Sequence, residues 1–269
     1  MHPILLRIGP ITLYSYGVML VVAFLTATWL ATRAAHQVPL PFRAINAEPL
    51  VDFISLSLLG GITGARLLYI ALQWDYFKQF PQELPAIWHG GLVWYGGFLG
   101  GLVAGWWYVC AQRLNLLRVL DQFIPFGALG HAIGRIGCFL NGCCYGRPTA
   151  SWCGVLFPDH REPRIPAQLI EAAGLAIIFL VLRRLQRPSI LRRPGSVFGS
   201  YLIGYGVLRF GVEFFRGDQT PFWCGMTLQQ LVSLGMIVAG GILLNRARKS
   251  HHGTNVPVRD RQRRGRAAA

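Results

Sequence analysis

The run GHAIGRIGCFLNGCCYGRP, residues 130–148, places an arginine inside an apolar stretch with the length and character of a membrane helix. A guanidinium in hydrocarbon costs at least about 2.5–3.5 kcal/mol on insertion scales, so Arg135 must face a partner, a water-filled cavity or an anionic ligand. Arg66 and Arg209 stand inside two other apolar segments. Three such arginines on three segments predict one anion-binding site within a membrane.

The composition assigns the chain to membrane proteins. Hydrophobic residues make up 53% of the 269 residues, the mean hydropathy is +0.41, and only 14% of residues are charged. The net charge of +15 is concentrated, because 13 of the 26 Lys and Arg lie in residues 183–193 and 246–266, beside apolar segments. Basic stretches in such places set topology and contact anionic lipid. We therefore expect membrane lipids, and no nucleic acid, as partners.

Seven apolar segments have close to the ~20 residues that a helix needs to cross a bilayer. They cover residues 14–34, 50–72, 92–112, 117–140, 166–184, 196–215 and 227–245. Asp121 and Pro125 interrupt the fourth segment. The pattern predicts an all-α, polytopic membrane protein of about seven transmembrane helices. An integral membrane domain over residues 1–245 is followed by a basic, disordered cytoplasmic tail over 246–269.

The distribution of basic residues predicts the orientation. Alternate connections and the C-terminal tail carry 17 Lys and Arg, against 6 on the other side. The N-terminus is therefore expected outside and the C-terminus in the cytoplasm. This orientation puts the three arginines in the outer halves of their segments, where Tyr16 and Tyr95 begin two further segments. The alternative is that each arginine separately extends its side chain to the membrane–water interface and that the three share no site.

Helical spacing predicts two pairings. Glu213 follows Arg209 by four residues, on the same helix face, which favours a salt bridge. His131 precedes Arg135 by four residues and shares its face. This histidine is either a proton relay or a buried, hydrogen-bonded side chain.

Four of the six cysteines lie between residues 138 and 153. The chain has no C-x-x-C pair and no histidine pair with ligand spacing, so we expect no zinc site. On an oxidising outer face a disulfide such as Cys144–Cys153 stays open as an alternative. A nucleophilic cysteine is a second alternative.

Six blocks of the chain resemble the prolipoprotein diacylglyceryl transferase family and occur in the family's order. They are LYSYGVM (13–19), GARLLYI (64–70), IWHGGLVWYGGFLGG (87–101), GRIGCFLNGCCYGRP (134–148), PAQLIEA (166–172) and YGVLRFGVEFFRGD (205–218). The resemblance implies an enzyme of the bacterial inner (cytoplasmic) membrane that carries out the first step of lipoprotein maturation. Such an enzyme transfers the diacylglyceryl group of phosphatidylglycerol to the lipobox cysteine thiol of a prolipoprotein, forming a thioether and glycerol 1-phosphate.

The resemblance also implies the partners and the site residues. The partners are phosphatidylglycerol and the prolipoprotein signal peptide with its lipobox, and the reaction uses no cofactor and no metal. The implied catalytic residues are Arg135, Arg209 and Tyr95. The implied substrate-binding residues are Tyr16, Arg66, Arg135, Asn141, Gly146, Arg209 and Glu213.

The chain departs from the family at three positions. Many relatives have a histidine, often proposed as the base, where this chain has Tyr95. A phenol with a reference pKa of about 10 is a poor base at neutral pH, so we expect Tyr95 to donate a hydrogen bond instead. Cys143 stands where the signature often has glutamate, and Ile170 replaces a tyrosine.

Two other classes of protein are alternatives. A transporter of an organic anion would also use buried arginines, but it would usually show internal repeats and a site at the midplane. A non-catalytic lipid-binding or assembly protein would bind phosphatidylglycerol without turning it over. Incubation with labelled phosphatidylglycerol and a lipobox peptide separates these alternatives from the transferase.

Overall fold

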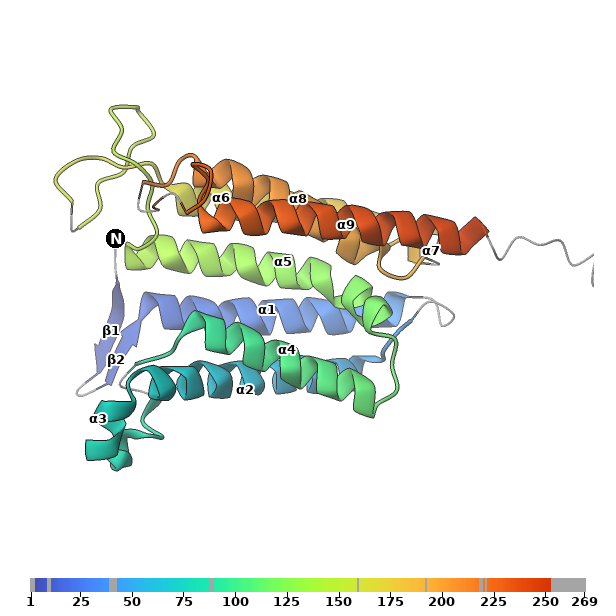
Figure 1. The fold of residues 1–269 in the computed structure, drawn as a ribbon, viewed down its shortest axis with the longest axis horizontal. Coiled ribbons are helices and arrows are strands. Elements are labelled where there is room, and N and C mark those ends of the chain that lie inside the picture. Colours follow the sequence, from blue (N-terminus) through green and yellow to red (C-terminus); the bar gives the residue numbers. More distant parts are fainter. Residues whose placement is uncertain are drawn as a thin grey trace, which may run out of the picture. The chain divides into compact units, whose positions relative to one another are not determined.

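The computed structural model describes residues 3–8, 11–38, 43–87, 90–158, 160–191, 193–217, 220 and 222–252. In this part of the chain most residues are helical (Figure 1). The long helices are α1 (Ser15–Gln37), α2 (Ala47–Leu72), α4 (Trp94–Ala111), α5 (Leu116–Asn141), α6 (Ala167–Leu185), α8 (Ser196–Glu213) and α9 (Leu228–His252). The short ones are α3 (Trp74–Gln79), η2 (Pro81–Glu83) and α7 (Pro188–Leu191).

Each predicted apolar segment coincides with one of these long helices. Among the described residues, α1, α2, α5 and residues Leu228–Lys249 of α9 are long and apolar enough to cross a membrane. The other three long helices differ in composition, because α4 is rich in glycine and aromatic residues, and α6 and α8 carry charges. The helical membrane character is thus confirmed. Seven crossings, and their orientation, stay predictions.

The ends of the chain add two features to the predicted arrangement. Strand β1 (Ile4–Ile8) pairs antiparallel with β2 (Ile11–Tyr14), and α1 begins directly after this hairpin. The hairpin was not expected from the sequence, although isoleucine is a strong strand former. Helix α9 continues through residue 245, where the domain boundary was expected, to His252. The tail over 253–269 lies outside the described residues, so its disorder stays a prediction.

The chain divides into two compact units, which are described one at a time. The larger unit comprises residues 1–29 and 120–269 and includes the hairpin, the start of α1, and α5, α6, α8 and α9. Its core contains Ala128 and Ala132 of α5 and Leu175 of α6, packed against Tyr201 and Tyr205 of α8. The smaller unit comprises residues 30–119 and contains α2, α3 and α4.

Asp121, the acid that interrupts the fourth apolar segment, anchors the start of α8. Its side chain is buried and accepts hydrogen bonds from the amides of Gly195 at 2.7 Å and Phe198 at 2.8 Å. These amides belong to the helix N-terminus, where unpaired N–H groups and the helix dipole favour a negative charge. A charge that looks out of place in the sequence therefore has a structural role inside the larger unit.

Glycines bring α2 and α4 into close contact in the smaller unit. A Cβ atom on Gly96 would overlap the carbonyl oxygen of Gly64, and a Cβ atom on Gly100 would overlap that of Gly60. Small residues at such spacing let membrane helices approach until their backbones touch. The paired glycines are therefore a requirement of packing between α2 and α4.

Two adjacent glycines of α4 test this contact. A Cβ atom on Gly97 would lie 3.4 Å from the nearest atoms, an ordinary contact distance, whereas Gly96 has no such room. We expect Gly96→Ala to lower the free energy of unfolding by about 1–3 kcal/mol, as overpacking does, and Gly97→Ala to leave it nearly unchanged. Thermal unfolding in detergent, followed by circular dichroism, measures both. Equal stabilities of the two variants would contradict the close contact.

Candidate functional site

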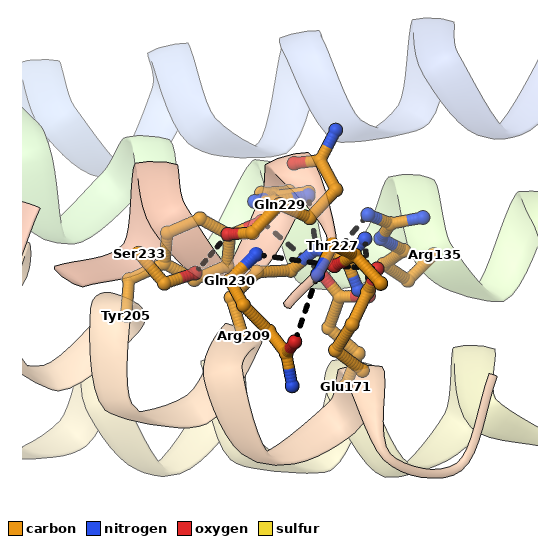
Figure 2. A network of polar contacts seen from close by, with 10 residues as sticks. Arg135, Glu171, Tyr205, Arg209, Thr227, Gln229, Gln230 and Ser233 are labelled. Carbon is orange, nitrogen blue, oxygen red and sulfur yellow. Dashed lines mark hydrogen bonds and ion pairs between the residues drawn. The ribbon is translucent and has the colours of Figure 1, made fainter. Parts of the chain in front are cut away.

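Two largely buried arginine–carboxylate pairs form the polar centre of the larger unit, and Figure 2 shows the network around Arg135, Glu171 and Arg209. Arg135 Nη2 lies 2.9 Å from Glu171 Oε1, and Arg209 Nη2 lies 2.9 Å from Glu213 Oε2. The side chains of Glu171 and Glu213 are only 2% and 1% exposed. An unpaired charge at this depth would be strongly destabilising, so each carboxylate fixes the arginine beside it.

Glu171 joins three helices. It lies in α6, pairs with Arg135 of α5, and its Oε1 accepts a hydrogen bond from the Tyr205 hydroxyl of α8 at 3.1 Å. His131 Nε2 of α5 lies 3.9 Å from the same oxygen, and the His131 ring contacts the Tyr205 ring edge-on at 5.2 Å. His131 is therefore a close neighbour of the carboxylate, beyond hydrogen-bonding distance.

Glu213 connects α8 with the first turn of α9. Its Oε1 accepts a hydrogen bond from the Thr227 hydroxyl at 2.7 Å. Thr227 also forms a capping box with Gln230: the Thr227 amide donates to Gln230 Oε1 at 3.0 Å, and the Gln230 amide donates to Thr227 Oγ1 at 3.3 Å. The predicted pairing of Arg209 with Glu213 is confirmed, and the threonine holds the acid in place.

Both arginines keep a buried donor without an acceptor. Arg135 Nε and Arg209 Nη1 have no hydrogen-bond partner within the described part of the chain. Leaving a buried donor unpaired costs about 1–3 kcal/mol, so such groups in a folded protein call for an explanation. A planar guanidinium with a free N–H suits a phosphate or carboxylate oxygen. Two free donors are consistent with a bound anion.

Three further predicted residues lie around the C-terminal end of α5. The Tyr16 ring approaches Gly137, where a Cβ atom would lie 3.5 Å from Tyr16 Cδ2. Asn141 is the last residue of the helix. The Gly146 amide donates to the Ile165 carbonyl at 2.8 Å, and a Cβ atom on Gly146 would lie 2.6 Å from the Phe215 carbonyl oxygen. Only glycine fits at position 146. This close approach holds the loop after α5 against the end of α8.

Arg66 belongs to the smaller unit, and its side chain is occupied by the fold. The guanidinium donates to four backbone carbonyls of the connection between α3 and α4, at 2.5–3.3 Å: those of Glu83, Leu84, Gly90 and Gly91. It also lies 5.2 Å from the Phe77 ring centre. These contacts give Arg66 a structural role in ordering that connection. Its role as a ligand to substrate stays a prediction.

Tyr95 also belongs to the smaller unit, as the second residue of α4. Its side chain is 56% exposed, and its ring meets the Trp94 ring edge-on at 5.3 Å. The phenol is thus accessible in this unit, and its catalytic role stays a prediction.

The contacts of Glu171, Tyr205 and Thr227 were not predicted from the sequence. The pairing of Glu171 could have been predicted, because an acid inside an apolar segment requires a cation, and Arg135 lies inside another apolar segment. Thr227 begins a T-x-x-Q sequence before an apolar run, which is a capping-box pattern. Tyr205 had no comparable signal, since its contact with Glu171 depends on how α6 and α8 pack.

Comparisons with known proteins give one consistent result. The family described as prolipoprotein diacylglyceryl transferase matches residues 3–246. The chain is similar to proteins named phosphatidylglycerol–prolipoprotein diacylglyceryl transferase. The one from Cupriavidus metallidurans is 34% identical over 96% of this chain and 97% of the relative. The one from Pseudoalteromonas atlantica is 38% identical over 90% and 87%, and the one from Streptococcus uberis is 32% identical over 92% and 96%.

Substitution of Thr227 tests the support beneath Arg209. Thr227→Val removes both the cap of α9 and the donor to Glu213, so we expect it to lower the free energy of unfolding by about 1–2 kcal/mol. Thr227→Ser keeps the hydroxyl and should stay within about 0.5 kcal/mol of the native protein. Thermal unfolding in detergent measures the difference. A valine variant as stable as the serine variant would show that the network does not depend on this hydroxyl.

Proposed function

Because the chain belongs to the prolipoprotein diacylglyceryl transferase family, we propose that Arg135 and Arg209 bind the phosphate of its lipid donor. The protein is a transferase of lipoprotein biosynthesis. It moves the diacylglyceryl group of phosphatidylglycerol to the lipobox cysteine thiol of a prolipoprotein and releases glycerol 1-phosphate. The observation that supports the phosphate assignment is the unpaired, buried donor on each arginine. The family match gives no support to the anion transporter considered from the sequence.

The charge changes of the reaction explain why arginines suit this site. The substrate sulfur forms a bond to the glyceryl carbon while the bond from that carbon to the phosphate oxygen breaks. The bonding electrons stay with the phosphate, which passes from a singly charged diester to a more highly charged monoester. Donors fixed before the reaction stabilise this growing charge more in the transition state than in the ground state.

Glu171 and Glu213 act as positioning residues for the two arginines. Each is nearly fully buried and holds one Nη2 group at 2.9 Å, which orients the remaining donors of the guanidinium. The carboxylates also neutralise the arginines when no lipid is bound, which lowers the free energy needed to keep two cations in an apolar region. Tyr16, Asn141 and Gly146 shape the space for the head group beside Arg135.

The substrate thiol must lose a proton, because the thiolate is the reactive nucleophile. Tyr95 donates a hydrogen bond that orients the thiol or the leaving group. His131 of the larger unit, whose Nε2 lies 3.9 Å from Glu171 Oε1, is the alternative acceptor of that proton. The prolipoprotein signal peptide brings its cysteine to the site from the bilayer.

The proposed setting is the bacterial inner membrane, with seven crossings, the N-terminus outside and the C-terminus in the cytoplasm. The four helices that are long and apolar enough to cross a membrane, and the excess of basic residues on one side, support this arrangement. In this orientation the arginines face the outer leaflet, where phosphatidylglycerol and the exported prolipoprotein meet.

The test of the proposed function uses purified protein, a lipobox peptide and labelled phosphatidylglycerol. Transfer of the label to the peptide thiol, with release of glycerol 1-phosphate, is the expected result. Phosphatidylethanolamine should be a poor donor, because its head group carries a cation that does not favour an arginine site. Equal turnover of the two lipids would contradict a site that selects on charge and on the glycerol head.

Lysine substitutions test the role of the arginines. Arg135→Lys and Arg209→Lys keep the charge but lose the planar fork that binds two oxygens. Each should lower turnover at least ~100-fold, or about 2.7 kcal/mol of transition-state stabilisation, as loss of one fixed donor does. Arg184→Lys, at an exposed position of α6, is the matched control and should be fully active. Near-native turnover of both site variants, with normal insertion, would rule out phosphate binding through the fork.

Substitutions of Tyr95 test the proton step. If the phenol orients the thiol or the leaving group, Tyr95→Phe should lower turnover by roughly 10–1,000-fold, within the range of general acid–base effects. Tyr95→His should retain activity, because the family resemblance implies a histidine at this position. Turnover by the two variants at saturating phosphatidylglycerol provides the measurement. A fully active phenylalanine variant would limit Tyr95 to packing and make His131 the next candidate.

A further inference from the structure

The turn after α5 brings the adjacent cysteines Cys143 and Cys144 close to Cys138, which lies five residues before Cys143. The Gly142 amide donates to the Phe139 carbonyl at 3.1 Å, and the Cys143 amide donates to the Cys138 carbonyl at 3.1 Å. With Gly142 at φ 79°, this is the Schellman arrangement that reverses the chain at a helix end. The reversal carries Cys143 and Cys144 back toward Cys138, on the last turn of α5.

The backbone around these cysteines is fixed on both sides of the turn. Cys144 has φ 63°, a left-handed conformation that is uncommon for any residue other than glycine, asparagine or aspartate. The Cys143 carbonyl accepts a hydrogen bond from Gln168 Nε2 of α6 at 2.5 Å, and Gly146 is bound to Ile165. As a result, the Sγ atoms of Cys138, Cys143 and Cys144 lie within 4.8 Å of one another, half-buried.

We propose that these three cysteines bind one soft metal ion, of the kind that Zn²⁺ and Cd²⁺ represent. A site with three sulfur donors selects thiophilic ions and disfavours Mg²⁺ and Ca²⁺, which prefer oxygen. With metal–sulfur bonds of about 2.3 Å, the sulfur atoms of a tetrahedral site lie about 3.8 Å apart. The cluster thus needs to contract by no more than about 1 Å, and a water molecule can complete the coordination.

The charges around the cluster favour the bound form. Three thiolates and a divalent ion together carry one negative charge. Arg135 lies one turn before Cys138 on α5, close enough to interact electrostatically with Cys138 and Cys144. Its positive charge therefore stabilises the anionic metal–thiolate group. Zinc was not expected from the sequence because the chain has no C-x-x-C pair, whereas this cluster has the spacing C-x₄-C-C and depends on the turn.

The mutual spacing of the three sulfur atoms favours binding of a metal ion by all three thiols over a disulfide between two of them. A disulfide brings two sulfur atoms to about 2.05 Å and would use only a pair of them. The bridge between Cys144 and Cys153 considered from the sequence is absent among the described residues, where all six cysteines are free. Cys153 is exposed, and its Sγ lies 3.4 Å from Ser151 Oγ.

Titration of the purified, phosphine-reduced protein with Cd²⁺ tests the proposal without using enzyme activity. Cadmium bound to thiolates gives a charge-transfer absorption in the ultraviolet, and we expect it to saturate at one ion per chain. Replacement of any one of the three cysteines by serine should weaken binding by more than the roughly 10–100-fold typical of losing an outer-shell partner. Cys110→Ser, Cys153→Ser and Cys224→Ser, at exposed lone cysteines, are matched controls and should bind as the native protein does.

Alkylation of the native protein covers the case of a variant that does not fold. Bound Cd²⁺ should protect Cys138, Cys143 and Cys144 from maleimide, as read by mass spectrometry, and leave Cys110, Cys153 and Cys224 reactive. Absence of the absorption in native protein, or protection of all six cysteines alike, would overturn the proposal. Near-native turnover of Arg135→Lys and Arg209→Lys, with intact Cd²⁺ binding, would count against the arginine assignment alone, so the two proposals fail separately.

Discussion

The buried contact between Arg135 and Glu171 is the interaction on which the larger unit depends. It joins α5 to α6, and through Tyr205 it also includes α8. Removing one partner of such a pair leaves an uncompensated charge and typically costs about 3–5 kcal/mol, much more than an exposed ion pair contributes. The pair therefore fixes both the packing of three helices and the direction in which the arginine presents its remaining donor.

The other helix contacts follow the same physical logic. Lipid chains are as apolar as leucine, so helices in a bilayer associate through close packing and polar contacts rather than by hiding apolar surface. The glycines of α2 and α4 supply the close packing in the smaller unit. Asp121, bound to the first amides of α8, supplies a polar contact in the larger one. In both units, contacts of backbone groups therefore contribute much of the packing between helices.

The sequence predicts the helices well because apolar length is a local property. All seven predicted segments are helical, and the pairing of Arg209 with Glu213 follows from helical spacing alone. What the sequence does not predict depends on contacts between segments. The Tyr205–Glu171 bond requires α6 and α8 to be packed together, and the cysteine cluster requires the turn at Gly142. The hairpin at the start was missed because its strands were too short to stand out beside an apolar helix.

The three arginines look alike in the sequence but end in different environments, and the difference bears on function. Arg66 donates to four carbonyls and so has its guanidinium occupied by the protein itself. Arg135 and Arg209 each meet one carboxylate and keep a buried donor unpaired. One donor on each of these two arginines is therefore left for a ligand, and the phosphate of the lipid donor has the charge and the oxygen atoms to accept from both.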